Sequence, residues 1–438
     1  MIGDDVRPAT YREIFAVGAF RVLFGSYVLL LVGDTVRMLA LAVLVYERTG
    51  SPALSALAYV AGFVPQAFGG ALLLSLTDRL PVRAAMVGYD LIRCVMALVL
   101  AVDVLPVWAV LVLLASVGLV SPVAGAARQR TLPELLHGDA YVLGRSVFGV
   151  TAGAMQVLGY AVGGVLLALV GPGGALVFAG VVALVSALVV RLGLARGTPA
   201  EGVASGGGAE VGGRGEAGGG AEAGGGAEVD GGAGAGPRPE GTIRATWRVN
   251  RELLGDPVVR GLLLAQWVPA NLTVAAEGVI VPYAPDHAGL LYGSTAAGML
   301  LGNLLVGRFV RPTRRERLVP WLALQLGIPL LFVAASPPVG VTAALFVLSG
   351  AGFAYQLGLQ RRFLAAVPKA GTGQAMGLAM TGTMTLQGVS MAGAGALAGV
   401  FDPGHVIALS GVATIIGTAM VWRMLRPGGV PTPEAAVV

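Results

Sequence analysis

The sequence has few charged residues, and this scarcity sets the class of protein. Only 12% of its 438 residues are Asp, Glu, Lys or Arg, whereas 55% are hydrophobic and the mean hydropathy is +0.79. Soluble globular domains carry about 25% charged residues. The composition therefore excludes a soluble domain and indicates a protein embedded in a lipid bilayer.

Cysteine, lysine and histidine are scarce as well. The single cysteine, Cys94, cannot form an internal disulfide. Lys369 is the only lysine, which together with the excess of Ala, Gly and Val is typical of GC-rich bacterial genomes. The three histidines stand in separate loops without metal-ligand spacing, and there is no Walker loop. We predict no metal, no cofactor and no enzymatic activity, and the net charge of +5 requires no nucleic acid partner.

Long hydrophobic runs fill most of the chain. A helix needs about 20 apolar residues to cross a bilayer. Six such runs precede a Gly-rich stretch, at 22–45, 53–76, 84–102, 107–126, 147–170 and 175–192. Six more follow it, at 261–283, 290–310, 318–335, 339–359, 373–400 and 406–424. The predicted fold class is an all-α membrane protein with twelve transmembrane helices in two six-helix halves.

A segment poor in large side chains separates the halves. It consists mostly of Gly, Ala and Glu and repeats the pentapeptide GGGAE three times. Such a composition cannot bury enough apolar surface to offset the entropy lost on ordering. We predict an N-terminal half over 1–196, a disordered linker over 197–241 and a C-terminal half over 242–438. An amphipathic lead-in helix over 242–255 either lies along the inner membrane surface or is solvated.

Basic residues alternate between connections as the positive-inside rule describes. The N-terminus and the even-numbered connections are basic, and Arg128, Arg130 and Arg145 follow the fourth span. The odd-numbered connections are acidic, with Arg48 their only base. We predict a multi-pass, monomeric protein of the bacterial inner membrane, with both termini and the linker in the cytoplasm.

Three segments carry a resemblance to a known family. They are LSLTDRLPVR at 74–83, ARQRTLPELL at 127–136 and GQAMGLAMTGTMTLQG at 373–388. The chain resembles the major facilitator superfamily, and within it bacterial drug-proton antiporters and the macrolide and siderophore (enterobactin) exporters. That branch ends its fifth span in GPxxGG, whereas this sequence has GYAVGG, with Tyr160 in place of the proline.

The resemblance implies a secondary transporter in which substrate binds between the halves and the halves rock against each other. It implies a cytoplasmic gate at Asp78, Arg79 and Arg83, because this loop joins helix ends through charge pairs in one transport state. The alternative is a loop that only fixes topology.

Ionisable side chains inside a bilayer cost about 2.5–3.5 kcal/mol each and are kept for pairing or function. Asp34 and Arg37 lie three residues apart in the first span, and Asp90 and Arg93 repeat this spacing in the third. The alternative to a functional role is a local ion pair that lowers the insertion cost.

Glu277 has no nearby base, since Arg260 is about 25 Å away along the same helix. Burial without a basic partner favours the neutral form of a carboxyl group. We predict that Glu277 and Asp34 couple transport to protons. The alternative is that Glu277 reaches the outer interface.

Other polar and flexible side chains are predicted to line the substrate cavity. At 100° per residue, Gln266 and Thr273 share a stripe with Glu277 in a span that contains Pro269. The remaining candidates are Tyr355, Gln356, Met380 and Met384. Methionines accept varied apolar ligands, although as an alternative they only fill space.

Small residues four apart allow close helix approach in membranes. The predicted helix-packing glycines are Gly159, Gly163, Gly164, Gly298 and Gly302.

These features predict proton-coupled efflux of a hydrophobic or amphipathic small molecule, with small molecules, protons and the lipid bilayer as partners. The alternatives are an importer or lipid flippase on the same fold, and a membrane scaffold or sensor that transports nothing.

Overall fold

The computed structural model describes residues 10–62, 65–66, 68–69, 80–137, 139–194, 242–367 and 372–425. These residues form helices and connections, with no strand among them. The predicted linker and the gate residues Asp78 and Arg79 lie outside the described residues.

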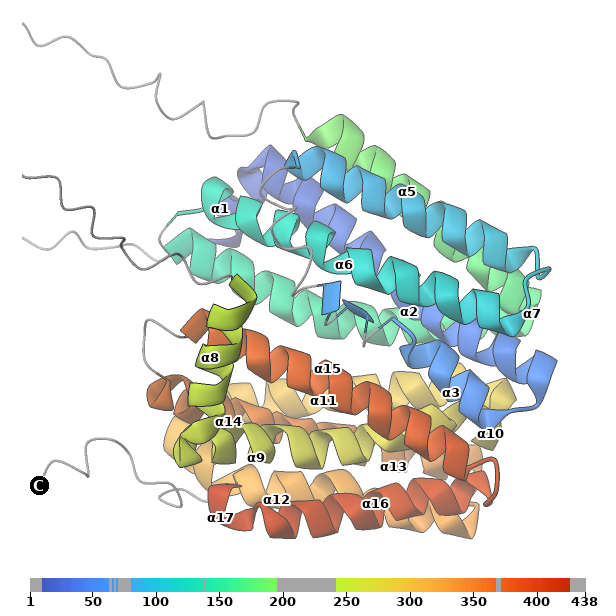
Figure 1. The fold of residues 1–438 in the computed structure, drawn as a ribbon, viewed down its shortest axis with the longest axis vertical. Helices are drawn as coiled ribbons and strands as arrows, with labels where there is room; N and C mark the ends of the chain where they lie inside the picture. The colour runs from blue at the N-terminus through green and yellow to red at the C-terminus, as the bar shows by residue number, and fades with distance from the viewer. Residues whose placement is uncertain are drawn as a thin grey trace, which may run out of the picture.

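The first half of the chain forms one bundle. Its described helices are α1 (Tyr11–Ala16), α2 (Gly18–Thr49), α3 (Pro52–Val60), α5 (Val82–Ala101), α6 (Val107–Leu135) and α7 (Asp139–Gly193). Gly171 interrupts α7 with φ 69° and ψ −177°, a backbone conformation that only glycine adopts without strain. The two parts of α7 run in opposite directions and form the predicted fifth and sixth spans (Figure 1).

The second half forms the other bundle. It begins with α8 (Thr242–Gly255), α9 (Pro257–Val274), η2 (Ala275–Val279), α10 (Ile280–Tyr283), η3 (Pro285–His287) and α11 (Ala288–Phe309). It continues with α12 (Pro312–Leu331), η4 (Phe332–Ala335), α13 (Val339–Ala351), η5 (Gly352–Ala354) and α14 (Tyr355–Ala366). The last elements are α15 (Thr372–Leu397), α16 (Pro403–Met420) and α17 (Trp422–Leu425).

The two bundles lie side by side with their helices roughly parallel to one direction (Figure 1). We call the end at which α1, α8 and α17 lie the linker end, and the opposite end, where α10 lies, the loop end. Among the described residues, the halves contact each other mainly through two helix pairs, α3 with α15 and α7 with α11, and α2 and α3 also contact η2 or α10.

Several spans begin at an acid or hydroxyl residue followed by proline. Asp256 and Asp402 accept hydrogen bonds from the first free backbone amides of α9 and α16, at 2.7 and 2.8 Å. Ser51 does the same for α3 at 3.4 Å. Proline in the first turn has no amide hydrogen to leave unsatisfied, so the Asp-Pro and Ser-Pro pairs start these helices efficiently.

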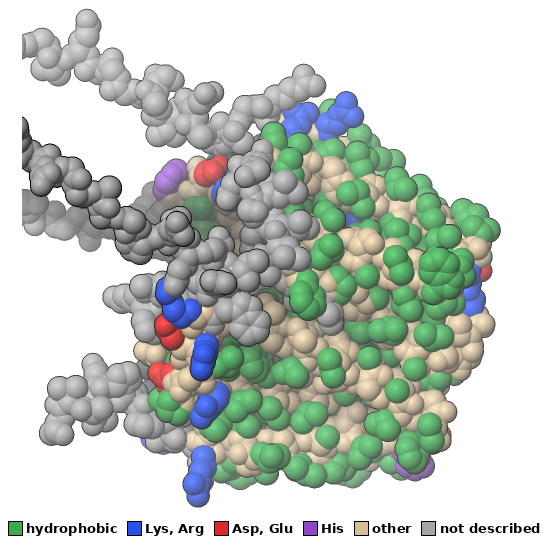
Figure 2. Space-filling model, in the orientation of Figure 1, with side chains coloured by type: hydrophobic (Ala, Val, Ile, Leu, Met, Phe, Trp, Pro, Cys, Tyr) green, Lys and Arg blue, Asp and Glu red, His purple; other side chains and the backbone are tan. Residues whose placement is uncertain are grey.

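Lipid is the natural environment of the outer surface. Hydrophobic side chains cover the middle of the face in Figure 2, and basic side chains gather at the linker end of the second half. Among the described residues, nine helical segments are long and apolar enough to cross a membrane. All twelve predicted spans contain helix in the described part of the chain, the second one over Pro52–Val60. The predicted fold class is confirmed.

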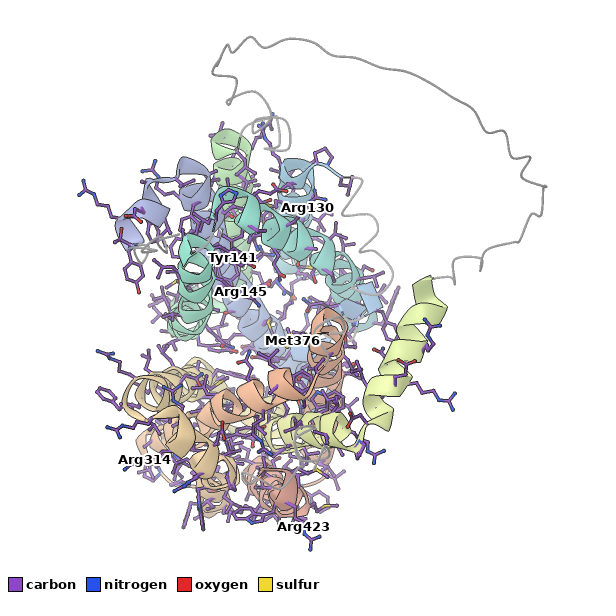
Figure 3. All side chains as sticks on the ribbon, turned by 90° about the vertical axis from the view of Figure 1, so that its left-hand side faces the viewer. Arg130, Tyr141, Arg145, Arg314, Met376 and Arg423 are labelled. Carbon is purple, nitrogen blue, oxygen red and sulfur yellow. The ribbon has the colours of Figure 1, made fainter. Side chains whose placement is uncertain are left out.

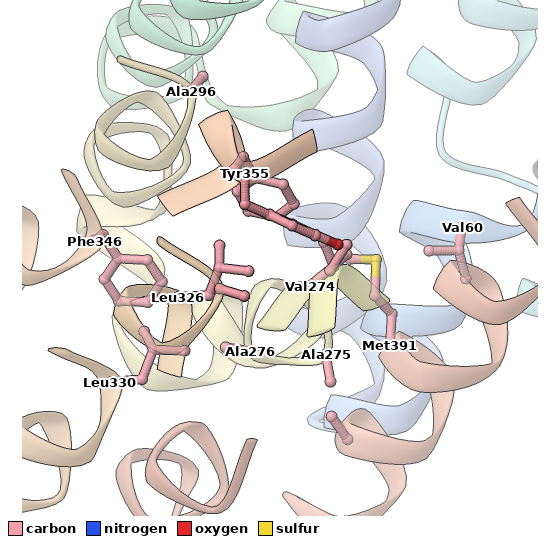
Figure 4. Close-up of a cluster of buried hydrophobic side chains, with 14 of the residues drawn as sticks. Val60, Val274, Ala275, Ala276, Ala296, Leu326, Leu330, Phe346, Tyr355 and Met391 are labelled. Atoms are coloured by element: carbon pink, nitrogen blue, oxygen red, sulfur yellow. The ribbon is translucent and has the colours of Figure 1, made fainter. Parts of the chain in front are cut away.

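The main apolar core lies in the second half and continues across the boundary between the halves. Figure 4 shows Tyr355, Leu326 and Phe346 within it, together with Val60 of α3 and Met391 of α15. Val60 and Met391 are buried where the two halves meet. The packing of the second half is thus continuous with the interface.

Candidate functional site

The first half encloses a cavity of about 490 Å³. It extends from the first turns of α7, at the linker end, to Asp34 near the middle of α2 and Tyr59 near the end of α3. Figure 3 looks onto the linker end, where Tyr141 and Arg145 lie on the side of the first half that faces the second. The polar lining residues are Tyr27, Asp34, Arg37, Tyr59, Gln66, Tyr89, Ser121, Arg128, Gln129, Tyr141 and Arg145.

A charge network joins three helices beside this cavity. The guanidinium of Arg37 lies 2.9 Å from the carboxylate of Asp34 on the same helix, α2. Arg93 of α5 contacts the carboxylates of both Asp34 and Asp90 at 3.2 Å. Ser186 of α7 donates a hydrogen bond of 2.6 Å to Asp90. The two predicted pairs are therefore one network, in which two acids and two arginines balance.

The network is buried unevenly. The Arg93 side chain is only 3% exposed, and Asp90 is buried with it. The Asp34 side chain is 33% exposed and faces the cavity. Charges in a low-dielectric interior must be paired and hydrogen-bonded. Arg93 and Asp90 thus hold Asp34 in place at the cavity wall.

Two further arginines line the cavity without an ion pair to a described acid. The sequence prediction placed Arg128 in a loop after residue 126, and this boundary is wrong, because α6 continues to Leu135 through Pro122 and Pro133. The guanidinium of Arg128 lies 5.5 Å from the ring centre of Tyr27. Arg145 is exposed on α7. Neither arginine forms an ion pair with a described acid.

Three tyrosines close the interface toward the loop end. Tyr292 of α11 stacks on Tyr59 and on Tyr160, with ring centres 5.0 and 5.2 Å apart. The hydroxyl groups of Tyr59 and Tyr160 are hydrogen-bonded to each other. One aromatic ring of the second half is thereby held by two rings of the first, and we call these three residues the tyrosine cluster.

Glu277 lies beside the tyrosine cluster. Its backbone carbonyl accepts a 2.7 Å hydrogen bond from Tyr292. Its carboxyl group is close enough to all three tyrosines to interact electrostatically, and no described base lies within ion-pair distance of it. The structure thus places Glu277 at the contact between the halves and not at the outer interface.

The predicted polar stripe of α9 is wrong for Thr273. Its hydroxyl is buried and lies 3.2 Å from that of Thr414 on α16, within the second half. The helix changes to 3-10 geometry at Ala275, and 3-10 turns advance by about 120° per residue, so Glu277 is rotated away from the stripe. Gln266 has a buried side-chain oxygen without a hydrogen-bond partner among the described residues.

The other cavity candidates do not line the cavity of the first half. Tyr355 is completely buried in the core of Figure 4 and donates a 2.8 Å hydrogen bond to the carbonyl of Gln266. Gln356 is partly buried beside Tyr355. Met380 is 57% exposed and Met384 is partly buried on α15. None of these four residues lines the cavity of the first half, and their part in a substrate cavity between the halves stays a prediction.

The predicted packing glycines all lie at helix contacts. A Cβ on Gly159 or Gly163 would meet Thr35 and Leu39 of α2, at 2.6 and 3.2 Å. A Cβ on Gly298 or Gly302 would meet backbone carbonyl oxygens of α13, at 2.2 and 2.3 Å. Gly164 faces Gly289 of α11 across the boundary between the halves, and a Cβ on Gly289 would lie 2.4 Å from the Cα of Gly164.

Of the predicted gate residues, only Arg83 is described. It donates a hydrogen bond to the carbonyl of Arg191 and so joins the start of α5 to the end of α7. This contact lies within the first half.

Sequence reasoning missed Arg128, Arg145 and the tyrosine cluster as site residues. Tyr160 carried a signal, since it stands where the resembled branch has proline. Tyr59 and Tyr292 carried none, because tyrosine is common in apolar spans near interfaces.

No protein-family model matches the chain, and no curated protein matches it. Solved structures are similar to it. A D-xylose-proton symporter is 15% identical, with a TM-score of 0.65 over 96% of this chain and 99% of that chain. The xylose transporter of E. coli in its inward open conformation is also 15% identical, with a TM-score of 0.63 over 94% of this chain and 96% of that chain.

A nucleoside transporter is 11% identical, with a TM-score of 0.64 over 92% of this chain and 99% of that chain. At these identities the likeness concerns the fold, and it extends over nearly the whole length of each protein. With two six-helix bundles that meet through α3–α15 and α7–α11, the chain has the fold of the major facilitator superfamily.

Proposed function

We propose that this protein is a secondary transporter that carries a small molecule across the bacterial inner membrane by alternating access. The observation that carries the proposal is the asymmetry of the two ends. A cavity extends from the linker end to mid-membrane, whereas the tyrosine cluster joins the halves toward the loop end. Access from one side only is the arrangement that alternating access requires of each state.

The contact between the halves at the tyrosine cluster consists of individually weak interactions. It consists of the ring of Tyr292 stacked on the rings of Tyr59 and Tyr160, and of close approaches such as Gly164 to Gly289 and Gly395 to Ala56. No ion pair between described residues crosses it. Each contact of this kind is worth about 1 kcal/mol, so rocking of the halves can break the contact at moderate cost.

Glu277 is the proposed proton-coupling residue. Its carboxyl group lies against the tyrosine cluster and has no described basic partner, so a change in its protonation alters the charge at the contact that must open. Asp34, held between Arg37 and Arg93, serves as an electrostatic element of the cavity. Basic residues at the linker end support a cytoplasmic location of that end, and proton flow inward then drives efflux.

The proposal is tested with a panel of antibiotics, siderophores and other small metabolites. Cells that express the protein should accumulate less of at least one compound, and collapse of the proton gradient should abolish the difference. Greater accumulation in expressing cells would indicate import. Equal accumulation of every compound, in cells with correctly inserted protein, would favour the scaffold or sensor alternative.

Glu277→Gln tests the coupling residue with the same compound. We expect loss of uphill efflux with unchanged membrane insertion, whereas Glu134→Gln, at an exposed acid of α6 outside the cavity, should leave efflux intact. Unchanged uphill efflux in Glu277→Gln would reject the coupling role.

A further inference from the structure

The cavity of the first half contains more positive charge than its own acids neutralise. Asp34 is the only acid among the described residues that line it, and Arg37 and Arg93 already contact that carboxylate. Asp90, behind the wall, is held by Arg93 and Ser186. The network is thus neutral within itself, and both Arg128 and Arg145 remain in excess.

Arg128 is the more informative of the two. Only 9% of its surface is exposed, yet it forms no ion pair or hydrogen bond with another described residue. Its Nε is buried without a hydrogen-bond partner among the described residues. A buried guanidinium with five donors and no acceptor is costly. The ring of Tyr27, 5.5 Å away, stabilises a cation but accepts no planar hydrogen bonds, and Asp90 acts on the guanidinium electrostatically without forming an ion pair with it. Among the described residues, none supplies a hydrogen-bond acceptor for this guanidinium, so a bound ligand could.

The rest of the lining indicates the size and chemistry of a ligand that could pair with Arg128. The aromatic residues that line the cavity are Tyr27, Tyr59, Tyr89, Tyr141 and Phe148. A volume of about 490 Å³ lies within the range of small-molecule sites, which is about 300–1,000 Å³. Two unpaired arginines in an aromatic enclosure match an acidic group attached to an apolar body.

We infer that this cavity binds an organic anion with an aromatic or apolar body, whose acidic group is held by the guanidinium of Arg128. Arg145, in the first turns of α7, meets the anion on its way in from the linker end and supplies a second positive charge. Carboxylates and phosphates pair with guanidinium through two parallel hydrogen bonds. The headgroup of an anionic lipid presents the same chemistry as a free organic anion. That the anion is the transported substrate rests on the proposed function, whereas its binding does not.

The test measures binding to the full chain purified into phosphatidylcholine nanodiscs. The probes are 2-naphthoate and 2-naphthylmethylammonium, which share one ring system and differ in charge. We expect 2-naphthoate to bind at least tenfold more tightly than the ammonium probe. Arg128→Gln should weaken 2-naphthoate binding about 10- to 100-fold, and Arg128→Lys should lose less because it keeps the charge.

Arg130→Gln is the matched control, since it removes the same charge two residues away on α6, outside the cavity lining. It should bind 2-naphthoate like the wild type. Monodisperse elution of each variant shows that it has folded. The inference is overturned if the ammonium probe binds as tightly as 2-naphthoate, if 2-naphthoate fails to bind at millimolar concentration, or if folded Arg128→Gln binds it unchanged.

A second arm identifies the source of the anion. Nanodiscs with phosphatidylglycerol should weaken 2-naphthoate binding if a lipid headgroup occupies the site, and leave it unchanged if the ligand is a free organic anion; both results support an anion site. Binding by a protein that transports nothing would reject the proposed function alone. Transport of a cation that is unaffected by Arg128→Gln would reject this inference alone.

Discussion

The two halves share one architecture but hold their charges differently. The first half contains a balanced network of two acids and two arginines beside a cavity with two further arginines. The second half has a single acid well inside its spans, Glu277, and a large apolar core that continues to the boundary. Under the proposed function, this difference assigns ligand recognition to the first half and control of the contact to Glu277.

Residues of both halves meet at Glu277 and at the end of the cavity. Glu277 meets no described base in its own half, and its polar neighbours include Tyr59 and Tyr160 of the first half. The cavity, in turn, ends at Tyr59, which Tyr292 of the second half covers. Under the proposed function, a ligand in the cavity and a proton on Glu277 would act on the same three rings.

The largest effect on stability is expected at Arg93, which joins the two acids of the network in the first half. Arg93→Leu leaves buried Asp90 without its ion pair and removes a contact of Asp34, so we expect a loss of about 3–5 kcal/mol in the free energy of unfolding. Denaturant unfolding in detergent measures it. Asp90→Asn added to Arg93→Leu should recover part of the loss. A loss below about 1 kcal/mol would show that the network contributes little to stability.

A smaller effect is expected where the halves touch. A Cβ on Gly289 would lie 2.4 Å from the Cα of Gly164, so Gly289→Ala must push the halves apart, at about 1–3 kcal/mol. Spin labels at Val104 and Asp286, in a Cys94→Ser background, should move further apart. Gly293→Ala is the control, since its Cβ would make an ordinary 3.6 Å contact with Tyr160. An unchanged label distance in Gly289→Ala would contradict a closed contact here.

Tyr292→Phe tests how much one hydrogen bond contributes to stability in the tyrosine cluster. The variant keeps both ring stacks and loses only the hydrogen bond to the carbonyl of Glu277, so stability should fall by about 1 kcal/mol. Thermal unfolding should rank Tyr292→Ala well below Tyr292→Phe. Equal losses in the two variants would mean that the stacks contribute nothing.

The smallest effect is expected at Thr273. Its hydroxyl pairs with Thr414 inside the second half, and such bonds between membrane helices average about 0.6 kcal/mol. Thr273→Val should therefore lower stability slightly and leave ligand binding unchanged. A large loss of binding would show that Thr273 does line the substrate cavity.

Much of this protein could be predicted from local sequence. Asp-Pro and Ser-Pro pairs mark helix starts, apolar runs mark spans, and the spacing of Asp34 with Arg37 predicts their contact. The boundary after residue 126 failed because Arg128 and Arg130 resemble a basic loop, although α6 continues through them. The stripe from Gln266 to Glu277 failed because the 3-10 turn at Ala275 changes the angle per residue.

The sequence alone determined the number of spans, their division into two halves and the spans that hold Asp34, Asp90 and Glu277, because each depends on the length and composition of one segment. Only the tertiary structure decided that Arg93 joins Asp34 to Asp90, that Arg128 faces a cavity, and that three tyrosines meet beside Glu277. The physical reason is that these spans are apolar on all sides, so their sequence does not state which face each helix turns toward its neighbours.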